Sequence, residues 1–495
     1  MTIEELLEFC DPLEVIGELP ARVGKLCQDS RTVKSGDIFI AVKGSISDGH
    51  NFIRDAVANG ASIVISEKAA PVDHNVAQII VKNSRSLLGP LAQLLAGNPA
   101  HQMNVIGITG TNGKTTVATL VWQILTKTGH KASMLGTVEK RINNDSFESR
   151  LTTSDPIELA EDMQKMVDAG SQYLVMEVSS HALHQQRVNG IPFTVAAFTN
   201  LTHDHLDYHQ SFDEYASAKK ILFNSLDNKS WAITNVDDPK GEWITNSTPA
   251  KVLTFGFKGK GLISATIIQS GYEGMVLRID DTEIFTPLAG DFNAYNVLQA
   301  LLICTALGLD GSAIKDALKE CKGAAGRLER ITTKDSSKNL PTIFVDYAHT
   351  PDALENVATT LKKLKSNRDK LIILFGCGGD RDKTKRPEMA RIAEQYGNEV
   401  IVTSDNPRTE DPDTIISDIM KGFKKPENVT AITSREEAIK KVIKESGPRA
   451  VILIAGKGHE TYQEINRERV HFDDREIALA ALMEKNGNPE KEEVA

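Results

Sequence analysis

The chain has 495 residues, of which 40% are hydrophobic and 5% aromatic, and its formal net charge at pH 7 is −10. This length predicts about three domains, and an acidic chain with few aromatic residues is a poor partner for nucleic acid. Five scattered cysteines without a C-x-x-C pair argue against disulfides and thiolate zinc sites, and they favour the cytoplasm. The acidic start, with no apolar run of about 20 residues, predicts neither a signal peptide nor a membrane span.

Residues 1–99 are predicted to form a small α/β domain. The expected strands lie at 38–42, 62–66 and 78–81, and the expected helices at 52–59 and 84–96. Two polar loops carry Ser30, Arg31, Asp48 and His50. These side chains could hold a polar ligand or could belong to ordinary solvated turns.

A strand, a glycine loop and a helix follow one another at the start of the next segment. A buried strand is expected at 105–108, and an amphipathic helix runs from Lys114 to near Gly129. The loop between them holds Gly110 and Gly113. Glycines let the backbone approach a phosphate closely, the N–H groups at the helix start point at the anion, and the lysine adds a positive charge.

The loop departs at one position from the general phosphate-loop pattern. That pattern has a glycine five residues before Gly113, where this chain has Ile108. Residues 110–116 nevertheless keep the lysine and a hydroxyl, from Thr115, that would ligate Mg²⁺. The alternative is a plain joint between a strand and a helix.

Residues 100–330 are predicted to form a central domain with a mostly parallel sheet of the P-loop ATPase type. Three strands each lead into a polar loop, and ligands gather at that edge of an open parallel sheet. Residues 251–286 read as an antiparallel appendage. The other expected strands are 132–137, 173–178, 194–199 and 231–236, and the helices are 157–169, 211–226, 293–307 and 312–320.

Two charged residues of this domain have competing interpretations. Glu177 ends an apolar strand and suits a Mg²⁺ ligand, although it could be a satisfied structural acid. Lys219 lies on an amphipathic helix, one turn after Tyr215 and one turn before Phe223. From the residues alone, Lys219 is predicted to be a solvated lysine.

A dense cluster of His203, His205, Asp207 and His209 follows another strand. The spacing H-x-H-x-D-x-H is not one of the standard zinc patterns. We therefore expect this cluster to act on bound nucleotide and Mg²⁺, with a transition-metal site or a structural role as the alternatives.

Residues 331–495 are predicted to form a Rossmann-like, doubly wound domain, because strands and helices alternate. No G-x-G-x-x-G pattern follows the first strand, so a dinucleotide is disfavoured. The expected strands are 343–347, 371–375, 400–404, 429–432 and 451–454, and the helices are 351–364, 387–397, 412–422, 435–445 and 474–485.

Three polar segments follow strands of this last domain. Residues 376–387 form a glycine-rich and then charged loop, either a mobile cover for an anionic substrate or a surface charge run. In the next segment Pro407 stiffens a turn between Asp405 and Arg408. An acid and a base held this way suit the zwitterionic head of an amino acid. Glu460 adds another acid at the same sheet edge.

Together these residues resemble the Mur ligases, ATP-dependent enzymes that form amide bonds in bacterial cell-wall precursors. The resemblance implies that ATP converts a carboxylate to an acyl phosphate, which an amine then attacks. It spans nearly the whole chain. The matching segments are 110–116, 177–181, 200–209, 326–327, 346–351, 376–387 and 405–408.

The resemblance also implies the site residues. The catalytic set is Lys114, Glu177, His205 and Lys219. The metal ligands are Thr115, Glu177, His205 and a carbamylated Lys219. The ATP site is Gly110, Thr111, Asn112, Gly113, Lys114, Thr115, Thr116, Asn296, Arg327 and Asp346. The UDP-substrate site is Ser30, Thr152, Thr153, Ser179, Gln185 and Arg187. The amino-acid site is Arg381, Asp405, Asn406, Pro407, Arg408, Gly456 and Glu460.

Within the family, residues 405–408 resemble the members that add meso-2,6-diaminopimelate to UDP-MurNAc-L-Ala-D-Glu, using ATP and Mg²⁺. Diaminopimelate has a carboxylate at both ends, so its pocket needs a fixed cation, which Arg408 and Arg381 would supply. The alternatives are the lysine-adding relatives, disfavoured by Arg408, and folylpolyglutamate synthase, disfavoured by the residues before Met103. A nucleotide-gated scaffold without turnover is the rival from another class. We expect a cytoplasmic monomer.

Overall fold

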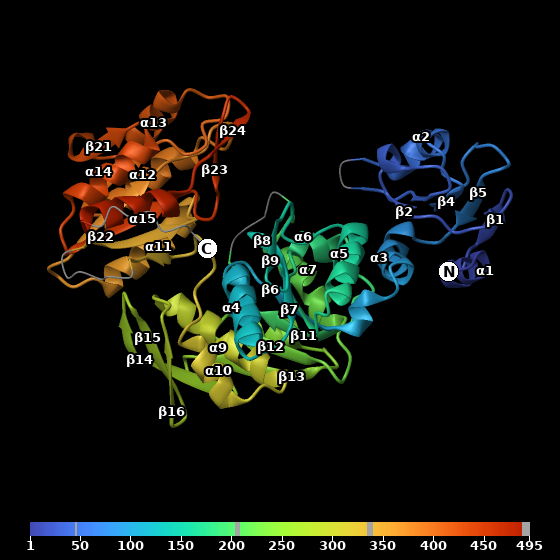
Figure 1. Cartoon of the computed structure of the whole chain (residues 1–495), viewed down its shortest axis with the longest axis horizontal. Helices are drawn as coiled ribbons and strands as arrows, with labels where there is room; N and C mark the ends of the chain where they lie inside the picture. Colours follow the sequence, from blue (N-terminus) through green and yellow to red (C-terminus); the bar gives the residue numbers. More distant parts are fainter. Residues whose placement is uncertain (45–46, 203–207, 334–339, 488–495) are drawn as a thin grey trace. The chain divides into compact units, whose positions relative to one another are not determined.

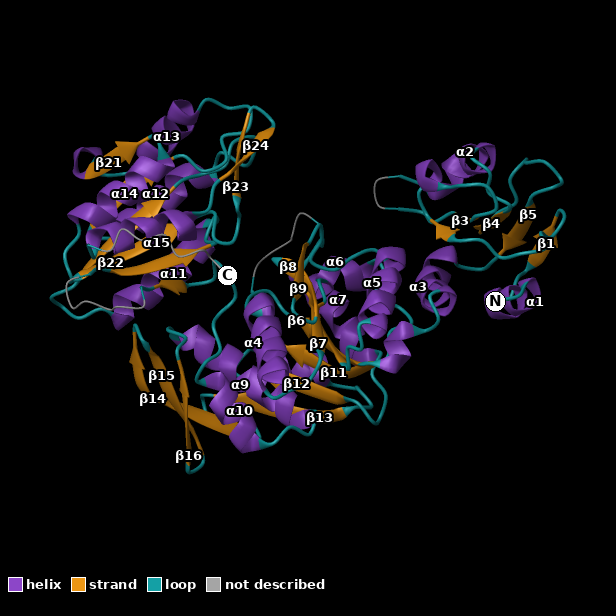
Figure 2. Ribbon diagram, in the orientation of Figure 1, coloured by secondary structure: helices purple, strands orange, loops and turns teal. Residues whose placement is uncertain are grey.

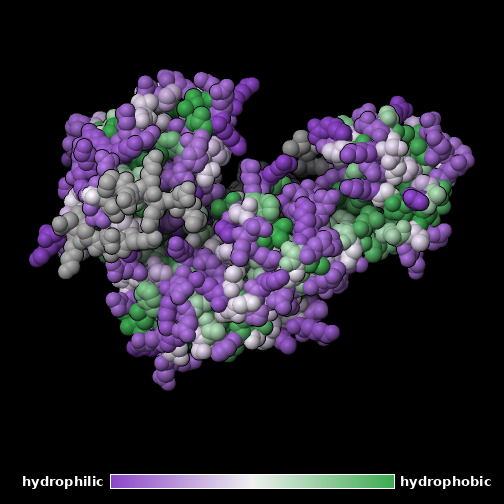
Figure 3. Space-filling model, viewed as in Figure 1, coloured by the Kyte–Doolittle hydropathy of each residue, from purple (hydrophilic) through white to green (hydrophobic). Residues whose placement is uncertain are grey.

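The computed structural model describes residues 1–44, 47–202, 208–333 and 340–487. It divides into two compact units, Met1–Ala265 with Tyr295–Ala317, and Thr266–Ala294 with Leu318–Ala495. Helices pack on β-sheets throughout (Figures 1 and 2), so the predicted α/β class is confirmed. Hydrophilic residues cover most of the face in Figure 3. No helix of the described part of the chain is both long and apolar enough to cross a membrane.

The first unit begins with a five-stranded sheet in the order β1-β5-β4-β3-β2. Strand β1 runs antiparallel to β5, and the other neighbours are parallel. Three of these strands were predicted, whereas β1, β2 and helix α1 were not. The bounds are α1 Ile3–Cys10, β1 Glu14–Ile16, β2 Leu26–Cys27, β3 Ile38–Ile40, α2 Ile53–Ala58, β4 Ile63–Ser66, β5 Ala77–Ile80 and α3 Ser84–Leu95.

The second sheet of this unit places β6 between β10 and β11, and β6 runs parallel to both. Val105, Ile106 and Ile108 of β6 are fully buried, as expected for a central parallel strand covered on both faces. The strand bounds are β6 Asn104–Thr109, β7 Ala132–Leu135, β8 Glu139–Ile142, β9 Asp145–Glu148, β10 Tyr173–Glu177, β11 Phe193–Phe198, β12 Trp231–Asn235 and β13 Lys251–Gly256. The helices are α4 Lys114–Lys127, α5 Pro156–Asp168, α6 Ser180–His184, α7 Phe212–Asn224, α8 Gly241–Thr245, α9 Asp291–Ala306 and α10 Gly311–Leu318.

The prediction of an antiparallel appendage at 251–286 is wrong for its first strand. Strand β13 pairs in parallel with β12, from Trp231 opposite Lys251 to Asn235 opposite Phe255. Parallel pairing needs a crossover, and the short helix α8, which sequence reasoning did not predict, lies on it. The later strands are β14 Ile263–Gly271, β15 Gly274–Ile279 and β16 Thr282–Thr286. Strand β14 also pairs in parallel with β13, against the prediction, whereas β15 and β16 are antiparallel as predicted.

The second unit holds a six-stranded sheet in the order β17-β18-β22-β19-β20-β21, parallel except for β17. All the predicted strands and helices of this region are present. Strand β17, which contains the predicted boundary at 330, and the hairpin β23–β24 were not predicted. The bounds are β17 Glu329–Ile331, β18 Thr342–Asp346, α11 Pro351–Leu364, β19 Lys370–Phe375, α12 Lys385–Tyr396, β20 Glu399–Thr403, α13 Pro412–Met420, β21 Val429–Ile432, α14 Arg435–Glu445, β22 Ala450–Ala455, β23 Tyr462–Ile465, β24 Glu468–His471 and α15 Asp474–Lys485.

Alternate residues of these strands enter two separate cores. Ile373 and Leu453 pack with residues of α11, α12 and α13. Ile372 and Ile452 pack with residues of α14 and α15. Because successive strand side chains point to opposite faces, helices cover both faces of the sheet, which is the doubly wound arrangement (Figure 1).

Candidate functional site

The phosphate loop, residues 110–116, connects β6 to the first turn of α4. Gly110 and Gly113 have φ angles of 146° and 86°, which L side chains rarely adopt. A Cβ atom at Gly110 would collide with Thr199 Oγ1, and one at Gly113 would collide with Asn296 Oδ1. The backbone therefore requires glycine at both positions, and it places the predicted nucleotide residue Asn296 against the loop.

The outer part of the loop is tied to the segment that follows β11. The backbone N–H of Thr111 donates to Asn200 O at 2.8 Å, and the N–H of Asn112 donates to Asn200 Oδ1 at 3.0 Å. Thr199 Oγ1 donates to Asn112 O at 2.6 Å. These bonds fix the loop at the carboxyl edge of the sheet, where ligands of parallel sheets bind.

Two lysines reach the same carbonyl oxygen of the loop. Lys114 Nζ donates to Gly110 O at 3.0 Å and to Thr111 O at 2.9 Å. Lys219 Nζ, from helix α7, donates to Gly110 O at 2.9 Å and lies 4.3 Å from the ring centre of Tyr215. Lys219 is only 1% exposed, so its interpretation as a solvated lysine is wrong. The amphipathic pattern of α7 did not reveal that this face of the helix packs against the loop.

Glu177 ends β10 beside the loop and is fully buried. Its Oε2 accepts hydrogen bonds from the hydroxyls of Thr115 and Thr137, each at 3.1 Å. Its Oε1 accepts from the backbone N–H of Thr137 at 2.8 Å. The structure thus brings together Thr115 and Glu177, two predicted metal ligands.

The donors at this point fit Mg²⁺, which prefers oxygen ligands from few protein groups together with phosphate. A carboxylate and a hydroxyl are already within hydrogen-bonding distance of each other. On binding Mg²⁺, the hydrogen bond between Thr115 and Glu177 would be replaced by contacts of both oxygens with the ion. No group of three or more His, Cys, Asp or Glu side chains is placed for a metal within the described ranges. His203, His205 and Asp207 lie outside the described residues.

The predicted UDP-substrate residues of the central sheet form one connected network. Thr153 Oγ1 donates to Glu177 O at 2.8 Å and accepts from the N–H of Ser179 at 3.1 Å. Arg187 Nη1 donates to Thr153 O at 3.0 Å, and Arg187 Nη2 donates to Gln185 Oε1 at 2.7 Å. Burial lowers the pKa of Arg187 from its ordinary value. The network joins this arginine to the strand that ends in Glu177.

Two further predicted UDP-substrate residues have separate surroundings. Thr152 Oγ1 accepts from Thr137 Oγ1 at 3.1 Å, so it lies one hydroxyl away from Glu177. Ser30 belongs to the five-stranded sheet region, where it is 7% exposed and its carbonyl accepts from Asn59 Nδ2 at 2.9 Å. The other residues of its loops are paired with neighbours, Arg31 with Asp29 and His50 with Asp48.

Arg327 and Asp346, predicted for the nucleotide, lie in the second unit. Asp346 Oδ2 accepts from the N–H of Leu328 at 2.6 Å, and Oδ1 accepts from the N–H of Ala348 at 2.8 Å. Burial raises the pKa of Asp346 to about 6, partly offset by Arg327 and these N–H groups. The Arg327 guanidinium lies 4.8 Å from the ring centre of Tyr347, and its buried Nε has no hydrogen-bond partner among the described residues.

Asp405, Asn406, Arg408 and Glu460 gather at the carboxyl edge of this sheet, and we call them the C-terminal polar cluster. Asn406 Nδ2 donates to Glu460 Oε2 at 2.8 Å, and the N–H of Asn406 donates to Asp405 Oδ1 at 2.6 Å. A Cβ atom at Gly456 would lie 2.6 Å from Asp405 Oδ2. The structure therefore brings Gly456 and Glu460 to the segment of 405–408, as predicted from their positions after strands.

Arg408 has a left-handed backbone, with φ 53°. Its N–H donates to Glu464 O at 3.0 Å, and its Nη1 donates to Gly379 O at 2.6 Å. Its Nε lies 3.6 Å from Glu464 Oε2. The guanidinium is thus held beside the glycine-rich loop after β19. Pro407 O lies where a Cβ of Gly379 would collide, whereas Arg381 of the same loop is exposed.

Two buried arginines support the segments around this cluster. Arg386 makes two hydrogen bonds to Glu410, at 3.0 and 3.1 Å, and one to Asp418. Arg386 holds the pKa of Glu410 down at about 2. Arg435 pairs with Asp474 through two hydrogen bonds and donates to Ser404 O and Ala455 O, at the ends of β20 and β22. Removing one partner of such a pair leaves an uncompensated buried charge.

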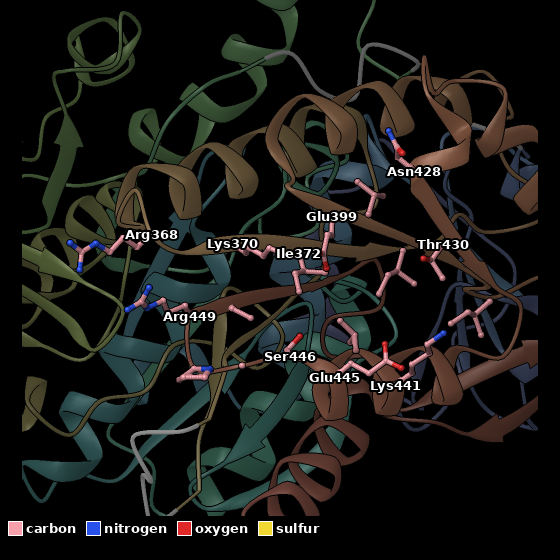
Figure 4. Close-up of a pocket in the computed structure, with 17 residues that line it drawn as sticks. Arg368, Lys370, Ile372, Glu399, Asn428, Thr430, Lys441, Glu445, Ser446 and Arg449 are labelled. Carbon is pink, nitrogen blue, oxygen red and sulfur yellow. Dashed lines mark hydrogen bonds and ion pairs between the residues drawn. The ribbon is translucent and has the colours of Figure 1, made fainter.

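A cavity of about 780 Å³ lies at the opposite, amino-terminal edge of the same sheet. Figure 4 shows its charged side chains, among them Lys370, Glu399, Lys441 and Arg449. All four are exposed, and Lys370 forms an ion pair with Glu399. None of the predicted site residues lines this cavity.

Three family models match the chain. The Mur ligase family, catalytic domain, matches residues 23–94, the Mur ligase middle domain matches 108–304, and the Mur ligase, glutamate ligase domain, matches 326–458. A protein from Geobacillus kaustophilus, named UDP-N-acetylmuramoyl-L-alanyl-D-glutamate–2,6-diaminopimelate ligase, is 42% identical over 469 residues, which cover 92% of this chain and 94% of that protein.

The chain belongs to the Mur ligase family.

A protein of the same name from Cytophaga hutchinsonii is 41% identical to this Mur ligase over 97% of the chain and 99% of its own length. A solved structure with that name has a TM-score of 0.73 and 33% identity, and covers 98% of this chain and 100% of its own. A folylpolyglutamate synthase structure from Mycobacterium tuberculosis shares the fold, with a TM-score of 0.59 at 21% identity over 75% of this chain.

Sequence reasoning missed three residues of this Mur ligase that contact the predicted sites. Thr137 donates two hydrogen bonds to Glu177, Glu464 contacts Arg408, and Lys457 contacts Asn406 and Glu460. A polar residue two positions after a buried strand was a usable signal for Thr137 and Lys457. Glu464 lies in an unpredicted hairpin strand, so its sequence carried no comparable signal.

Proposed function

We propose that this Mur ligase joins meso-2,6-diaminopimelate to the D-glutamate side-chain carboxylate of UDP-MurNAc-L-Ala-D-Glu, with conversion of ATP to ADP and phosphate. The observation that carries the proposal is the identity of 42% and 41% to proteins named for this reaction, over 92% and 97% of the chain. The presence of an acid, Asp405, and a base, Arg408, in one short segment supports the same amino acid.

The reaction has two steps. The substrate carboxylate oxygen attacks the γ-phosphorus of ATP, the bond to the β-phosphate oxygen breaks, and ADP leaves. The amine of diaminopimelate then attacks the acyl phosphate carbon, loses a proton, and expels inorganic phosphate. Activation is needed because a carboxylate is a poor electrophile, and the acyl phosphate supplies a good leaving group. The product is an amide.

The phosphate loop would bind and orient ATP. The N–H groups at the start of α4 and the Lys114 ammonium would stabilise negative charge that develops on the transferred phosphoryl group. Gly110 and Gly113 allow close approach, because larger residues would collide with neighbours. Asn296, Arg327 and Asp346 would bind the remainder of the nucleotide.

Thr115 and Glu177 would hold one Mg²⁺, and His205 with a carbamylated Lys219 would hold a second. Bound Mg²⁺ neutralises phosphate charge during transfer. Two ammonium groups now share the Gly110 carbonyl, and like charges at such distances repel. Addition of CO₂ to the Lys219 amine, with loss of a proton, would replace one cation by an anionic ligand.

The three predicted domains divide the substrates among them. Residues 1–99 with Ser30 would bind the uridine diphosphate, and residues 100–330 would bind ATP and, through the Arg187 network, the sugar and peptide. Residues 331–495 would bind the amino acid. The reaction uses cytoplasmic ATP, and we propose a cytoplasmic monomer.

The C-terminal polar cluster would select diaminopimelate. Arg408, held by Gly379 O and Glu464, offers a guanidinium to a carboxylate, and Arg381 would add a second cation. Asp405 and Glu460 would accept from an ammonium group. A lysine-adding enzyme would need no cation for the far end of its substrate, so Arg408 disfavours that alternative.

Phosphate release by the purified protein tests the proposal. The assay contains ATP, Mg²⁺ and UDP-MurNAc-L-Ala-D-Glu, with diaminopimelate, lysine or ornithine as the amine. We expect release with diaminopimelate alone. Release with lysine at equal efficiency supports the lysine-adding alternative, and no amino-acid-dependent release contradicts the ligase assignment.

A further inference from the structure

Lys457 is a fully buried lysine next to the C-terminal polar cluster. It follows β22 by two residues and has 0% of its surface exposed. Its Nζ donates to Asn406 Oδ1 at 3.0 Å, to Glu460 Oε2 at 3.2 Å and to Tyr462 O at 2.5 Å. An ammonium has three hydrogens, so each of them has an acceptor.

Burial of a charged lysine is unfavourable unless the charge is paired and hydrogen-bonded. Two of the three acceptors of Lys457 belong to residues that we assign to amino-acid binding. The buried ammonium of Lys457 is therefore stabilised only when Asn406 and Glu460 keep the positions in which they accept its hydrogen bonds.

Lys457, together with the backbone N–H of Glu464, determines which way the Asn406 amide points. Asn406 Oδ1 accepts from Lys457 Nζ and from the N–H of Glu464, both at 3.0 Å. Both donors require an oxygen at this position, so the amide nitrogen must face the other way, where Nδ2 donates to Glu460 Oε2 at 2.8 Å.

Asn406 and Lys457 together orient the Glu460 carboxylate. Its Oε2 accepts from both Asn406 Nδ2 and Lys457 Nζ. Its Oε1 has no hydrogen-bond partner among the described residues, and the side chain is 17% exposed. This oxygen is the one left to accept from a substrate ammonium.

We infer that Lys457 is a positioning residue for amino-acid selection, because it helps to fix the Asn406 amide and holds Glu460 Oε2, which leaves Oε1 for the substrate. The inference rests on the proposed function. Lys457 acts through its two neighbours and does not touch the substrate itself. Its loss should therefore affect the amino acid while leaving ATP and the UDP-substrate unaffected.

The test compares Lys457→Met with Lys140→Met. Lys140 is a matched control, because it is also buried, 8% exposed, and paired with Glu158 and Asp162 in the other unit. Melting temperatures identify conditions in which both variants are folded. KM is then measured separately for diaminopimelate, ATP and UDP-MurNAc-L-Ala-D-Glu.

We expect Lys457→Met to raise KM for diaminopimelate by about tenfold or more, from lost charged hydrogen bonds, with KM for the other two substrates within about twofold. Lys140→Met should lower the melting temperature without this selective change. An unchanged KM for diaminopimelate, or an equal rise for all three substrates, would overturn the inference.

Lys457→Gln provides a second variant, since it keeps a neutral donor toward Asn406. A smaller rise in KM for diaminopimelate is expected for it. If neither variant folds, Lys457 is structural and the inference is wrong. A wild-type protein without diaminopimelate-dependent phosphate release would instead contradict the proposed function, so the two failures are distinguishable.

Discussion

The Nζ atom of Lys219 lies 2.9 Å from the carbonyl oxygen of Gly110, which also accepts from Lys114 at 3.0 Å. The two residues of this contact are 109 positions apart in the chain. Helix α7 thus places the buried amine of Lys219 against the phosphate loop. The helical pattern alone had predicted an exposed lysine at this position.

Replacing Lys219 by methionine should therefore abolish most activity. If the carbamylated side chain ligates Mg²⁺, kcat in Lys219→Met should fall by at least about a hundredfold, comparable to the loss of other groups that stabilise transition-state charge. Lys220→Met is the control, because the Lys220 amine contacts Trp243 O instead of the loop.

A ¹³C signal from labelled bicarbonate should appear in the wild type and be absent in Lys219→Met. Activity within about twofold of wild type would contradict this role.

The Mg²⁺ requirement should depend on Thr115 more than on Thr137. Both hydroxyls lie 3.1 Å from Glu177 Oε2, but only Thr115 belongs to the phosphate loop. Thr115→Val should raise the Mg²⁺ concentration for half-maximal activity by about tenfold, since it removes an oxygen ligand. Thr137→Val is the matched variant and should shift it by less than about twofold. Equal shifts would show that the hydroxyls only orient Glu177.

Arg408 should control the affinity for diaminopimelate. Arg408→Lys keeps the charge but loses the planar fork that binds a carboxylate through two hydrogen bonds. KM for diaminopimelate should rise by about tenfold or more, with KM for ATP changed by less than about twofold. Steady-state kinetics with each substrate varied in turn measures both. Equal increases for both substrates would refute the assignment.

His459 should make the protein less stable in acid. Burial, with help from the positive charge of Arg327, lowers the pKa of His459 from its ordinary value to about 4. Its neutral form is favoured in the folded state, so its contribution to stability is present above pH 6.5 and is lost as the pH falls toward 4. His459→Gln should therefore show a smaller drop in melting temperature between pH 7 and pH 5, on the order of a few degrees for a change near 1 kcal/mol.

His471 offers a control of opposite sign. A hydrogen bond to Glu476 raises the pKa of this exposed histidine, so its contribution is present below its unfolded pKa and is lost as the pH rises. His471→Gln should slightly deepen the acid-side drop. Asp346, whose pKa is raised to about 6, also changes the stability in this pH range. Its contribution cancels, because each variant is compared with wild type at the same pH. An unchanged pH profile in His459→Gln would contradict the expectation.

Most of the regular structure was predictable because parallel strands are buried on both faces and appear as apolar runs. Strand β6 is an example, and helix α4 was predictable from its amphipathic pattern. Short or exposed elements were missed, since β1 has only three residues and β24 is exposed at every position, so neither forms a buried apolar run. Strand β13 was predicted to be antiparallel but pairs in parallel with β12, because the direction of pairing is decided by tertiary contacts.

The candidate site was predictable where a polar residue ends a buried strand or follows it within two residues. Glu177 ends β10, and Asp405 lies two residues after β20. Burial was not predictable for Lys219 and Lys457, because a lysine on a helix or in a loop is usually exposed. Only the packing of α7 on the phosphate loop, and of Asn406 on Lys457, shows that these amines are enclosed.

The stoichiometry of the complete reaction tests the central claim most directly. Purified protein is incubated with ATP, Mg²⁺, UDP-MurNAc-L-Ala-D-Glu and meso-2,6-diaminopimelate, and ADP, phosphate and the UDP-linked product are quantified together by chromatography and mass spectrometry. The account predicts equal amounts of ADP, phosphate and a product that carries diaminopimelate on the D-glutamate side chain, with none when lysine replaces diaminopimelate. ATP hydrolysis without that product, or equal product with lysine, would contradict it.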